Sequence, residues 1–164
     1  MNQISIEDII AMNALYRPGP MEYIPDFIAG KKNENEIKYD CPQLIPILKK
    51  TYGVIVYQEQ VMEILRELAG YTWGRSDLVR RAMSKKHMEE ILAEEQNFIY
   101  GNKEEYEKRK DSAEPICYIP GCVANGIPVE AAKTIFDKML IFANYAFNKC
   151  STRSTLKFTK GWHS

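Results

Sequence analysis

Residues 58–70, QEQVMEILRELAG, contain the clearest helical pattern in the chain. Their apolar residues recur every three or four positions and therefore share one face of a helix. The residues on this face are Val61, Ile64, Leu65 and Leu68. Gly70 stands where a glycine commonly ends a helix. The segment predicts a helix over 58–69 with one buried face, which other elements must cover.

Similar patterns predict helices on both sides of this segment. Ser5 precedes Asp8 by three residues, as in a capping box, and an apolar stripe follows over 6–15. The other predicted helices are 23–29, ended by Gly30, one or two turns within 44–50, 76–84 capped by Ser76 or Asp77, 87–100 and 128–143. We expect a solvated loop over 31–38.

One short run favours a strand. Residues 53–57, GVIVY, are β-branched and bounded by glycine, which suits a strand better than a helix. A single strand cannot form a sheet, so we expect its partner outside this chain. The predicted fold class is mainly α, an irregular multi-helix domain with at most one or two short strands.

Composition indicates one compact domain. The chain has 164 residues, of which 45% are apolar, enough for a sizeable core. No apolar run approaches the ~18 to 20 residues that span a bilayer, and the start lacks the features of a signal peptide. We therefore expect a cytoplasmic protein with no membrane partner. The four cysteines lack paired spacing for zinc, and free thiols are expected.

The domain prediction has three parts. Residues 1–149 form the helical domain, and within it 102–121 is rich in charge and then in proline, so we expect a surface insertion loop. Residues 150–164 alternate Ser, Thr and basic residues without a clear element, and we expect a poorly ordered tail.

The strongest candidate for function is residues 74–86, GRSDLVRRAMSKK. Its five cations are Arg75, Arg80, Arg81, Lys85 and Lys86. On a helix Arg81 and Lys85 lie one turn apart, and arginine's planar fork matches phosphate oxygens two at a time. The alternative is an ordinary exposed ion pair between Asp77 and Arg81. Because one aspartate cannot neutralise five cations, the pattern favours an anion site.

Other residues have weaker signals. Arg17 lies in a rigid turn, RPGP over 17–20, and either presents its charge to a ligand or caps a helix. Asn148 and Lys149 follow a predicted helix end, where a lysine also pairs with free carbonyls. Glu59 has no partner suited to general-base work, and no strand carries alternating carboxylates for metal-assisted phosphoryl transfer. We therefore expect a chain that binds phosphate without performing chemistry.

Several blocks together resemble the alpha subunit of bacterial DNA polymerase III, a C-family replicative polymerase. They are ALYRPGPM (14–21), IPDFIA (24–29), TYG (51–53), YQEQVM (57–62), DLVRRAMSKK (77–86) and FNK (147–149). The blocks follow the family's order over residues 5–149. In that family this region is similar to the end of the palm and the fingers, which close over the incoming nucleotide.

The resemblance assigns roles to particular residues. It implies that Arg80 and Arg81 hold the triphosphate of a dNTP, with charge added by Lys85 and Lys86, while Arg17 braces the palm side. Asn148 and Lys149 are expected to face the same cleft. The implied partners are dNTP, DNA primer-template and the remainder of the alpha subunit.

The resemblance also implies what this chain lacks. The family's catalytic aspartates, which hold two Mg²⁺ ions in the full-length enzyme, are expected upstream of residue 1. The chain alone should therefore hold no cofactor and should not polymerise DNA, although the family is a nucleotidyltransferase. It should also expose apolar surface and self-associate. The alternative hypothesis is a stand-alone helical module that binds an acidic partner.

The chain departs from the family in two places. After Lys149 the family continues with serine, histidine and small residues, whereas residues 150–153 read CSTR. This change suggests a frame slip or a truncated reading frame. Residues 102–121 resemble a lineage-specific insertion.

Overall fold

The protein is mainly helical, as predicted. The computed structural model describes residues 3–85 and 87–143, and no β-strand occurs in these residues. The α-helices are α1 (Ile6–Leu15), α2 (Ile24–Lys32), α3 (Ile45–Leu48), α4 (Gln58–Ala69), α5 (Trp73–Lys85), α6 (Met88–Tyr100), α7 (Lys103–Arg109) and α8 (Val129–Ala143). Short 3-10 helices are η1 (Pro20–Tyr23), η2 (Glu34–Glu36), η3 (Pro42–Leu44) and η4 (Lys49–Thr51).

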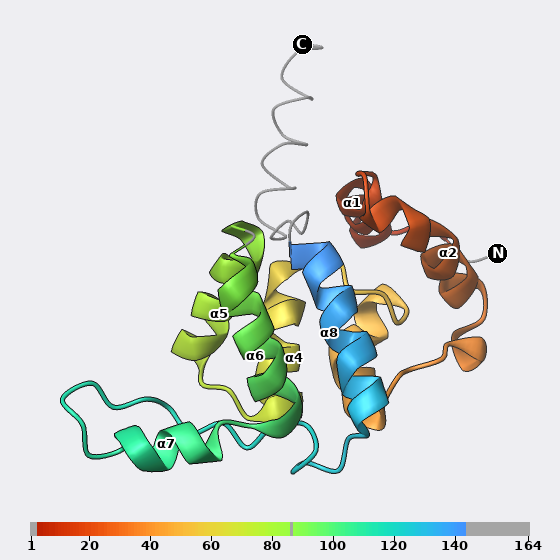
Figure 1. Cartoon of the computed structure of the whole chain (residues 1–164). Helices are drawn as coiled ribbons and strands as arrows, with labels where there is room; N and C mark the ends of the chain where they lie inside the picture. Colours follow the sequence, from red (N-terminus) through yellow and green to blue (C-terminus); the bar gives the residue numbers. More distant parts are fainter. Residues whose placement is uncertain (1–2, 86, 144–164) are drawn as a thin grey trace.

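Helix α4 is the centre of the packing. It contacts α3, α5, α6 and α8, and in Figure 1 α5 and α6 lie on one side of α8 while α1 and α2 lie on the other. The predicted apolar face is fully buried, because Val61, Ile64, Leu65 and Leu68 are each 0% exposed. Gly70 ends the helix in the left-handed conformation, at φ 78°. The prediction over 58–69 is confirmed.

Helix α1 also begins as predicted. The Ser5 hydroxyl accepts a hydrogen bond from the Asp8 amide at 3.1 Å, and Asp8 Oδ2 accepts one from the Ser5 amide at 2.7 Å. Asp8 also forms an ion pair with Lys31 of α2, which joins the two helices. This local motif therefore has a second, tertiary function.

The strand prediction over 53–57 was wrong. Val54, Ile55 and Val56 are buried, as a strand would be, but no described segment pairs with them to form a sheet. The Val56 and Tyr57 amides instead donate to Gln60 Oε1, at 2.8 and 3.0 Å. A side chain of the following helix thus satisfies backbone donors that a neighbouring strand would otherwise take.

The predicted end of α2 at Gly30 was also wrong, because the helix continues to Lys32. Gly30 is buried inside the helix, and a Cβ atom there would lie 2.9 Å from both Tyr52 Cβ and the Tyr52 carbonyl oxygen. The glycine therefore permits close packing and does not stop the helix. As a result, Lys31 and Lys32 belong to α2 and not to the loop predicted over 31–38.

Helix α5 begins earlier than predicted, at Trp73. The Thr72 hydroxyl accepts a hydrogen bond from the Arg75 amide at 3.2 Å, so Thr72 caps the helix. Ser76 and Asp77, the predicted caps, lie inside it. The Ser76 hydroxyl donates to the Thr72 carbonyl at 2.8 Å, a bond back to the preceding turn.

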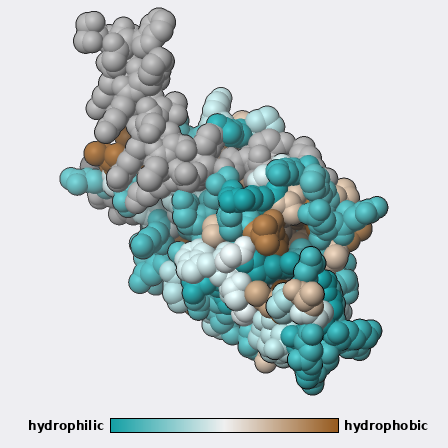
Figure 2. Space-filling model, turned by 90° about the vertical axis from the view of Figure 1, so that its left-hand side faces the viewer, coloured by the Kyte–Doolittle hydropathy of each residue, from teal (hydrophilic) through white to brown (hydrophobic). Residues whose placement is uncertain are grey.

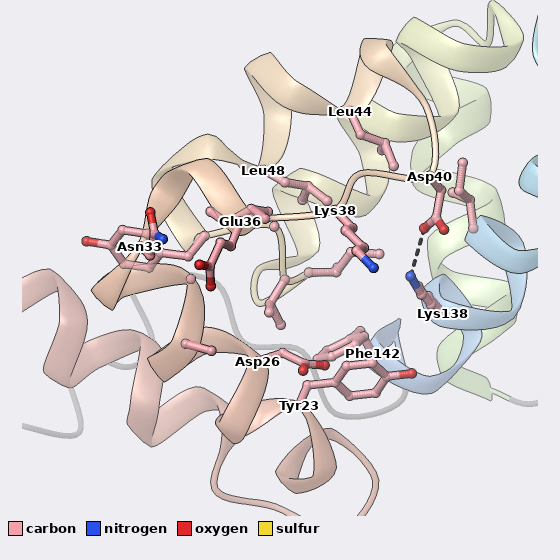
Figure 3. A pocket seen from close by; sticks show the side chains of 18 residues that line it. Tyr23, Asp26, Asn33, Glu36, Lys38, Asp40, Leu44, Leu48, Lys138 and Phe142 are labelled. Carbon is pink, nitrogen blue, oxygen red and sulfur yellow. Dashed lines mark hydrogen bonds and ion pairs between the residues drawn. The ribbon is translucent and has the colours of Figure 1, made fainter.

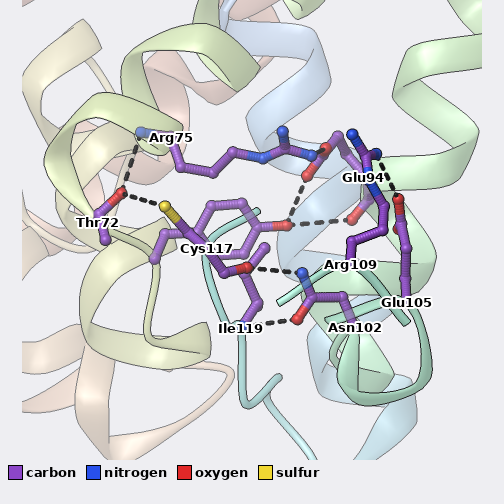
Figure 4. A network of polar contacts seen from close by, with 9 residues as sticks. Thr72, Arg75, Glu94, Asn102, Glu105, Arg109, Cys117 and Ile119 are labelled. Carbon is purple, nitrogen blue, oxygen red and sulfur yellow. Dashed lines mark hydrogen bonds and ion pairs between the residues drawn. The ribbon is translucent and has the colours of Figure 1, made fainter. Parts of the chain in front are cut away.

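The predicted insertion loop over 102–121 contains a helix, α7, which extends away from the body of the molecule (Figure 1). No α7 residue is buried, so it lacks the apolar stripe that would have predicted it. Asn102 holds the returning chain, since its side chain accepts from the Ile119 amide at 2.7 Å and donates to the Cys117 carbonyl at 2.8 Å (Figure 4). Whether the segment is an insertion stays a prediction.

The remaining helix predictions are confirmed within one or two residues, including those that became α1, α3, α6 and α8.

No helix in the described residues has both the length and the apolar composition that crossing a membrane requires.

Replacing Gln60 with leucine should destabilise the protein by about 2 to 4 kcal/mol, because the buried amides of Val56 and Tyr57 would lose their acceptor. Urea unfolding followed by circular dichroism measures this free energy. The control is Gln96→Leu at an exposed position of α6, which should change it by less than about 0.5 kcal/mol. Equal effects of the two substitutions would contradict the structural function of Gln60.

Stability should fall at alkaline pH because Cys122 is 0% exposed, and burial raises the pKa of its thiol from 9.0 to about 12. Between these values the unfolded chain loses the thiol proton while the folded chain keeps it. The free energy of unfolding should therefore fall by up to about 1.4 kcal/mol per pH unit. Urea unfolding from pH 8 to 11 should show a shallower decline for Cys122→Ala than for the unmodified chain, and equal declines would contradict the expectation.

Candidate anion-binding site

The candidate site lies on the exposed face of α5. The helix packs into the core through Ser76, Val79 and Met83, which are 0%, 3% and 1% exposed. These positions recur at helical spacing, so the residues between them face away from the core. Arg81 and Lys85 are exposed and one turn apart, with Arg80 partly exposed beside them.

Arg80 is held in a defined orientation. Its Nε and Nη2 atoms donate to Asp77 Oδ1 at 3.2 and 2.6 Å, and Nη1 donates to Gln58 Oε1 of α4 at 3.2 Å. The side chain is only 19% exposed. A guanidinium fixed by two neighbouring helices loses less side-chain entropy when it binds a ligand than a freely moving one.

Arg81 is more accessible than Arg80. Its Nη2 atom lies 2.7 Å from Asp77 Oδ2, and its side chain is 60% exposed. Asp77 therefore contacts both arginines, and the hydrogen bond from Arg80 is the main reason that the pKa of Asp77 lies below 3.8. The ion pair between Asp77 and Arg81, which the sequence offered as the alternative, is present in the structure.

The two ion pairs do not neutralise this face. Asp77 contributes one negative charge, while Arg80, Arg81 and Lys85 contribute three positive charges. Lys85 is exposed and forms no ion pair with another described residue. An excess of positive charge therefore remains on α5, partly ordered by Asp77 and Gln58.

Arg75 does not belong to this face, although it lies in the same basic segment. Its guanidinium forms an ion pair with Glu94 of α6, a side chain that also accepts a hydrogen bond from the Tyr71 hydroxyl at 2.8 Å (Figure 4). Glu94 is 7% exposed and Tyr71 is 4% exposed. Burial raises the pKa of Tyr71, as does the negative charge of Glu94. Arg75 thus joins two helices and is unsuited to ligand binding.

Of the other predicted site residues, only Arg17 lies in the described part of the chain. Arg17 follows α1, which lies across α8 from α5 in Figure 1. Lys86, Asn148 and Lys149 lie outside the described residues, and their predicted roles stay predictions.

Aromatic residues near α5 divide between core and surface. Tyr71 is buried, whereas Trp73 is 50% exposed and lies under the Arg66 guanidinium, 4.3 Å from the ring centroid.

Glu59 is an exposed residue of α4, as expected for the polar edge of that helix. Cys41, Cys117 and Cys122 are free thiols, as predicted, and Cys150 lies outside the described residues.

A cavity of about 310 Å³ lies away from α5, between α2, the segments 36–40 and 52–55, and α8 (Figure 3). Its charged side chains have both signs, and Lys138 Nζ lies 2.7 Å from Asp40 Oδ2. Tyr23 and Phe142 form part of its wall, with ring centroids 5.0 Å apart. Because its charges are mixed, the cavity shows no clear preference for an anion or a cation.

The family of the chain follows from its sequence relatives. A sequence profile of the family described as "Bacterial DNA polymerase III alpha subunit finger domain" matches residues 1–106. The chain belongs to this finger-domain family. The family resemblance of the sequence blocks in α1, α4 and α5 is thereby confirmed.

The individual relatives are alpha subunits of bacterial DNA polymerase III. DNA polymerase III subunit alpha of Halalkalibacterium halodurans is 47% identical over 142 residues, covering 87% of this chain and 11% of the relative. The protein of that name from Chlamydia trachomatis is 46% identical over 145 residues, covering 88% and 10%. That from Staphylococcus epidermidis is 43% identical over 151 residues, covering 92% and 12%. The chain therefore spans about a tenth of the length of these relatives.

Sequence reasoning missed three residues that fix α4 and α5 around the candidate site. Thr72 starts α5, Gln58 orients Arg80, and Gln60 holds the segment that leads into α4. No motif in the sequence singles out Gln58 or Gln60. Their position at the first turn of a strongly amphipathic helix is the signal that could have found them.

The described residues contain no cluster of metal-ligating side chains of the kind that commonly holds a metal ion. No three His, Cys, Asp or Glu side chains among them lie close enough together to hold a metal ion. The family resemblance places the aspartates of the two-magnesium centre upstream of residue 1, and that placement stays a prediction.

Proposed function

We propose that this finger-domain chain is a piece of a template-directed DNA polymerase and that α5 binds the triphosphate of an incoming dNTP. The observation that supports this proposal is the oriented Arg80, which lies beside the accessible charges of Arg81 and Lys85. Several positive charges on one helical face match a ligand that has several phosphate oxygens.

The geometry suggests that each of the three cations has a different role in phosphate binding. Arg80, held by Gln58 and Asp77, would define the position of one phosphate. Arg81 would exchange Asp77 for phosphate, and Lys85 would add a mobile charge. Each charge contact contributes about 1 kcal/mol in water and about 4 kcal/mol where the site is partly shielded. Closure of the complete enzyme over the nucleotide would provide such shielding.

The larger polymerase would supply the remaining parts of the reaction. In this proposal the rest of the alpha subunit contributes the aspartates that hold Mg²⁺ and the surface that binds the DNA primer-template. Lys86, Asn148 and Lys149 would add to the nucleotide cleft, and Arg17 would support the palm side. The chain alone would bind nucleotide without polymerising DNA, and its cellular compartment would be the cytoplasm.

The apolar surface of the chain is suited to contact with the rest of the subunit. Figure 2 shows one side of the molecule, mostly hydrophilic with a hydrophobic patch. Large apolar side chains that are at least 48% exposed include Ile6, Ile9 and Tyr16 near α1, and Leu78, Met88 and Leu92 on α5 and α6. Neighbouring domains would cover such residues in the larger protein.

The isolated chain should therefore self-associate as its concentration rises, because these apolar side chains would otherwise stay in water. Light scattering across a concentration series measures the mean mass. A mass that stays at 19.0 kDa up to millimolar concentration would contradict the expectation.

Nucleotide binding can be measured by NMR during titration of the full chain with a dNTP and Mg²⁺. Amide shifts should concentrate on α5, and the double substitution Arg80→Ala and Arg81→Ala should weaken binding by at least about tenfold. The matched control is Arg109→Ala on α7, an arginine that is 42% exposed and pairs with Glu105. This substitution should leave the affinity unchanged.

Two further ligands separate the competing functions. A deoxynucleoside without phosphates should bind far more weakly than the triphosphate, because the proposed contacts are to phosphate oxygens. If the triphosphate causes no shifts while a glutamate-rich peptide does, the chain is instead the acidic-partner module. Equal binding by the double variant and the unmodified chain would also overturn the proposal.

A further inference from the structure

A second groove lies between α1, α3 and α4 and has a volume of about 300 Å³. Its apolar part comes from Ala11, Phe27 and Ile47, which are 3%, 1% and 6% exposed. Tyr57, at the start of α4, adds a half-buried aromatic ring. The groove thus has a floor of buried apolar side chains and enough volume for a long side chain.

The rim of this groove is strongly acidic. Four carboxylates, those of Glu7, Asp8, Glu59 and Glu63, line it together with one cation, Lys50. The formal charges of these five lining residues sum to −3, and Lys31, which does not line the groove, offsets one of them by pairing with Asp8. Such a sum distinguishes the groove from the cavity in Figure 3, where aspartate, glutamate and lysine are mixed.

The carboxylates differ in the ion pairs and hydrogen bonds that they already form within the chain. Asp8 pairs with Lys31 and accepts a hydrogen bond from the Tyr52 hydroxyl at 3.4 Å. Glu59 and Glu63 lie one turn apart on α4, and neither forms an ion pair with another described residue. Glu63 is half-buried, so its charge is partly removed from water.

Helix α4 separates this acidic groove from the basic face of α5. Gln58 bonds to Arg80, whereas Glu59, Gln60 and Glu63 line the groove. The chain has 22 basic and 22 acidic residues, yet its charge is unevenly distributed around this helix. A phosphate-bearing ligand would be repelled by the groove, and a cation would be attracted.

We propose that this groove binds an arginine side chain presented by a protein partner. The guanidinium would pair with the Glu59 and Glu63 carboxylates, and its planar fork suits two carboxylate acceptors. The methylene groups would lie along the apolar floor, and the Tyr57 ring would offer a face to the cation. The surface would therefore recognise protein, whereas α5 would recognise phosphate.

The probe is the capped peptide acetyl-Ala-Leu-Arg-Leu-Ala-amide, titrated into the full chain and followed by NMR. Amide shifts should concentrate on residues that line the groove in α1 and α4. The double substitution Glu59→Gln and Glu63→Gln keeps the side-chain shape and should weaken binding by about tenfold. Glu67→Gln is the matched control, because Glu67 is an exposed residue of α4 outside the groove lining.

A peptide with citrulline in place of arginine tests the charge itself, since citrulline has nearly the same shape but is neutral. It should bind about tenfold more weakly, and added salt should weaken only the arginine peptide. Equal binding of the two peptides, an unchanged affinity of the double variant, or shifts confined to α5 would overturn the proposal. None of these outcomes alters the triphosphate experiment, which concerns the opposite charge and another helix.

Discussion

The structure depends on the complete burial of one face of α4. Val61, Ile64, Leu65 and Leu68 are each 0% exposed, and α3, α5, α6 and α8 pack around this helix. Burying a single aliphatic side chain of this size contributes about 1.5 to 3 kcal/mol, so this face is a large share of the stability of a small domain. The polar residues of α4 must then point to the part of the helix surface that no other helix covers. A ligand can reach α4 only on this part of its surface.

The first turn of α4 shows how one short segment serves three purposes. Gln60 points inward and binds the Val56 and Tyr57 amides, while its Nε2 donates to the Thr51 hydroxyl at 2.8 Å. Gln58 points toward α5 and orients Arg80. Glu59 faces the acidic groove. Successive residues of a helix lie about 100° apart, so three neighbours can reach three different surroundings.

Membership of the finger-domain family gives this arrangement a context. The chain spans about a tenth of the length of its relatives, so most surfaces of those relatives lie outside the matched region. A basic face on α5 and an acidic groove beside α1 would let one small unit contact a phosphate ligand and a protein neighbour at once.

The sequence by itself determined the helices that have an apolar stripe and a local stop signal. Helix α4 followed from its buried face and Gly70, and α1 followed from the Ser5 and Asp8 capping box. Such signals act within a few residues, which is why they can be read directly from sequence. The family, too, was evident from short blocks of residues, and the profile match over 1–106 confirmed it.

Only the tertiary structure decided which polar groups meet. Residues 53–57 resemble a strand by propensity, yet Gln60 satisfies two of their amides, and Gly30 continues a helix because Tyr52 packs against it. Arg75 looked equivalent to Arg80 and Arg81 until Glu94, nineteen residues away in the sequence, paired with it. Hydrogen bonds and ion pairs form wherever folding brings donors and acceptors together, and no local pattern records contacts between distant segments.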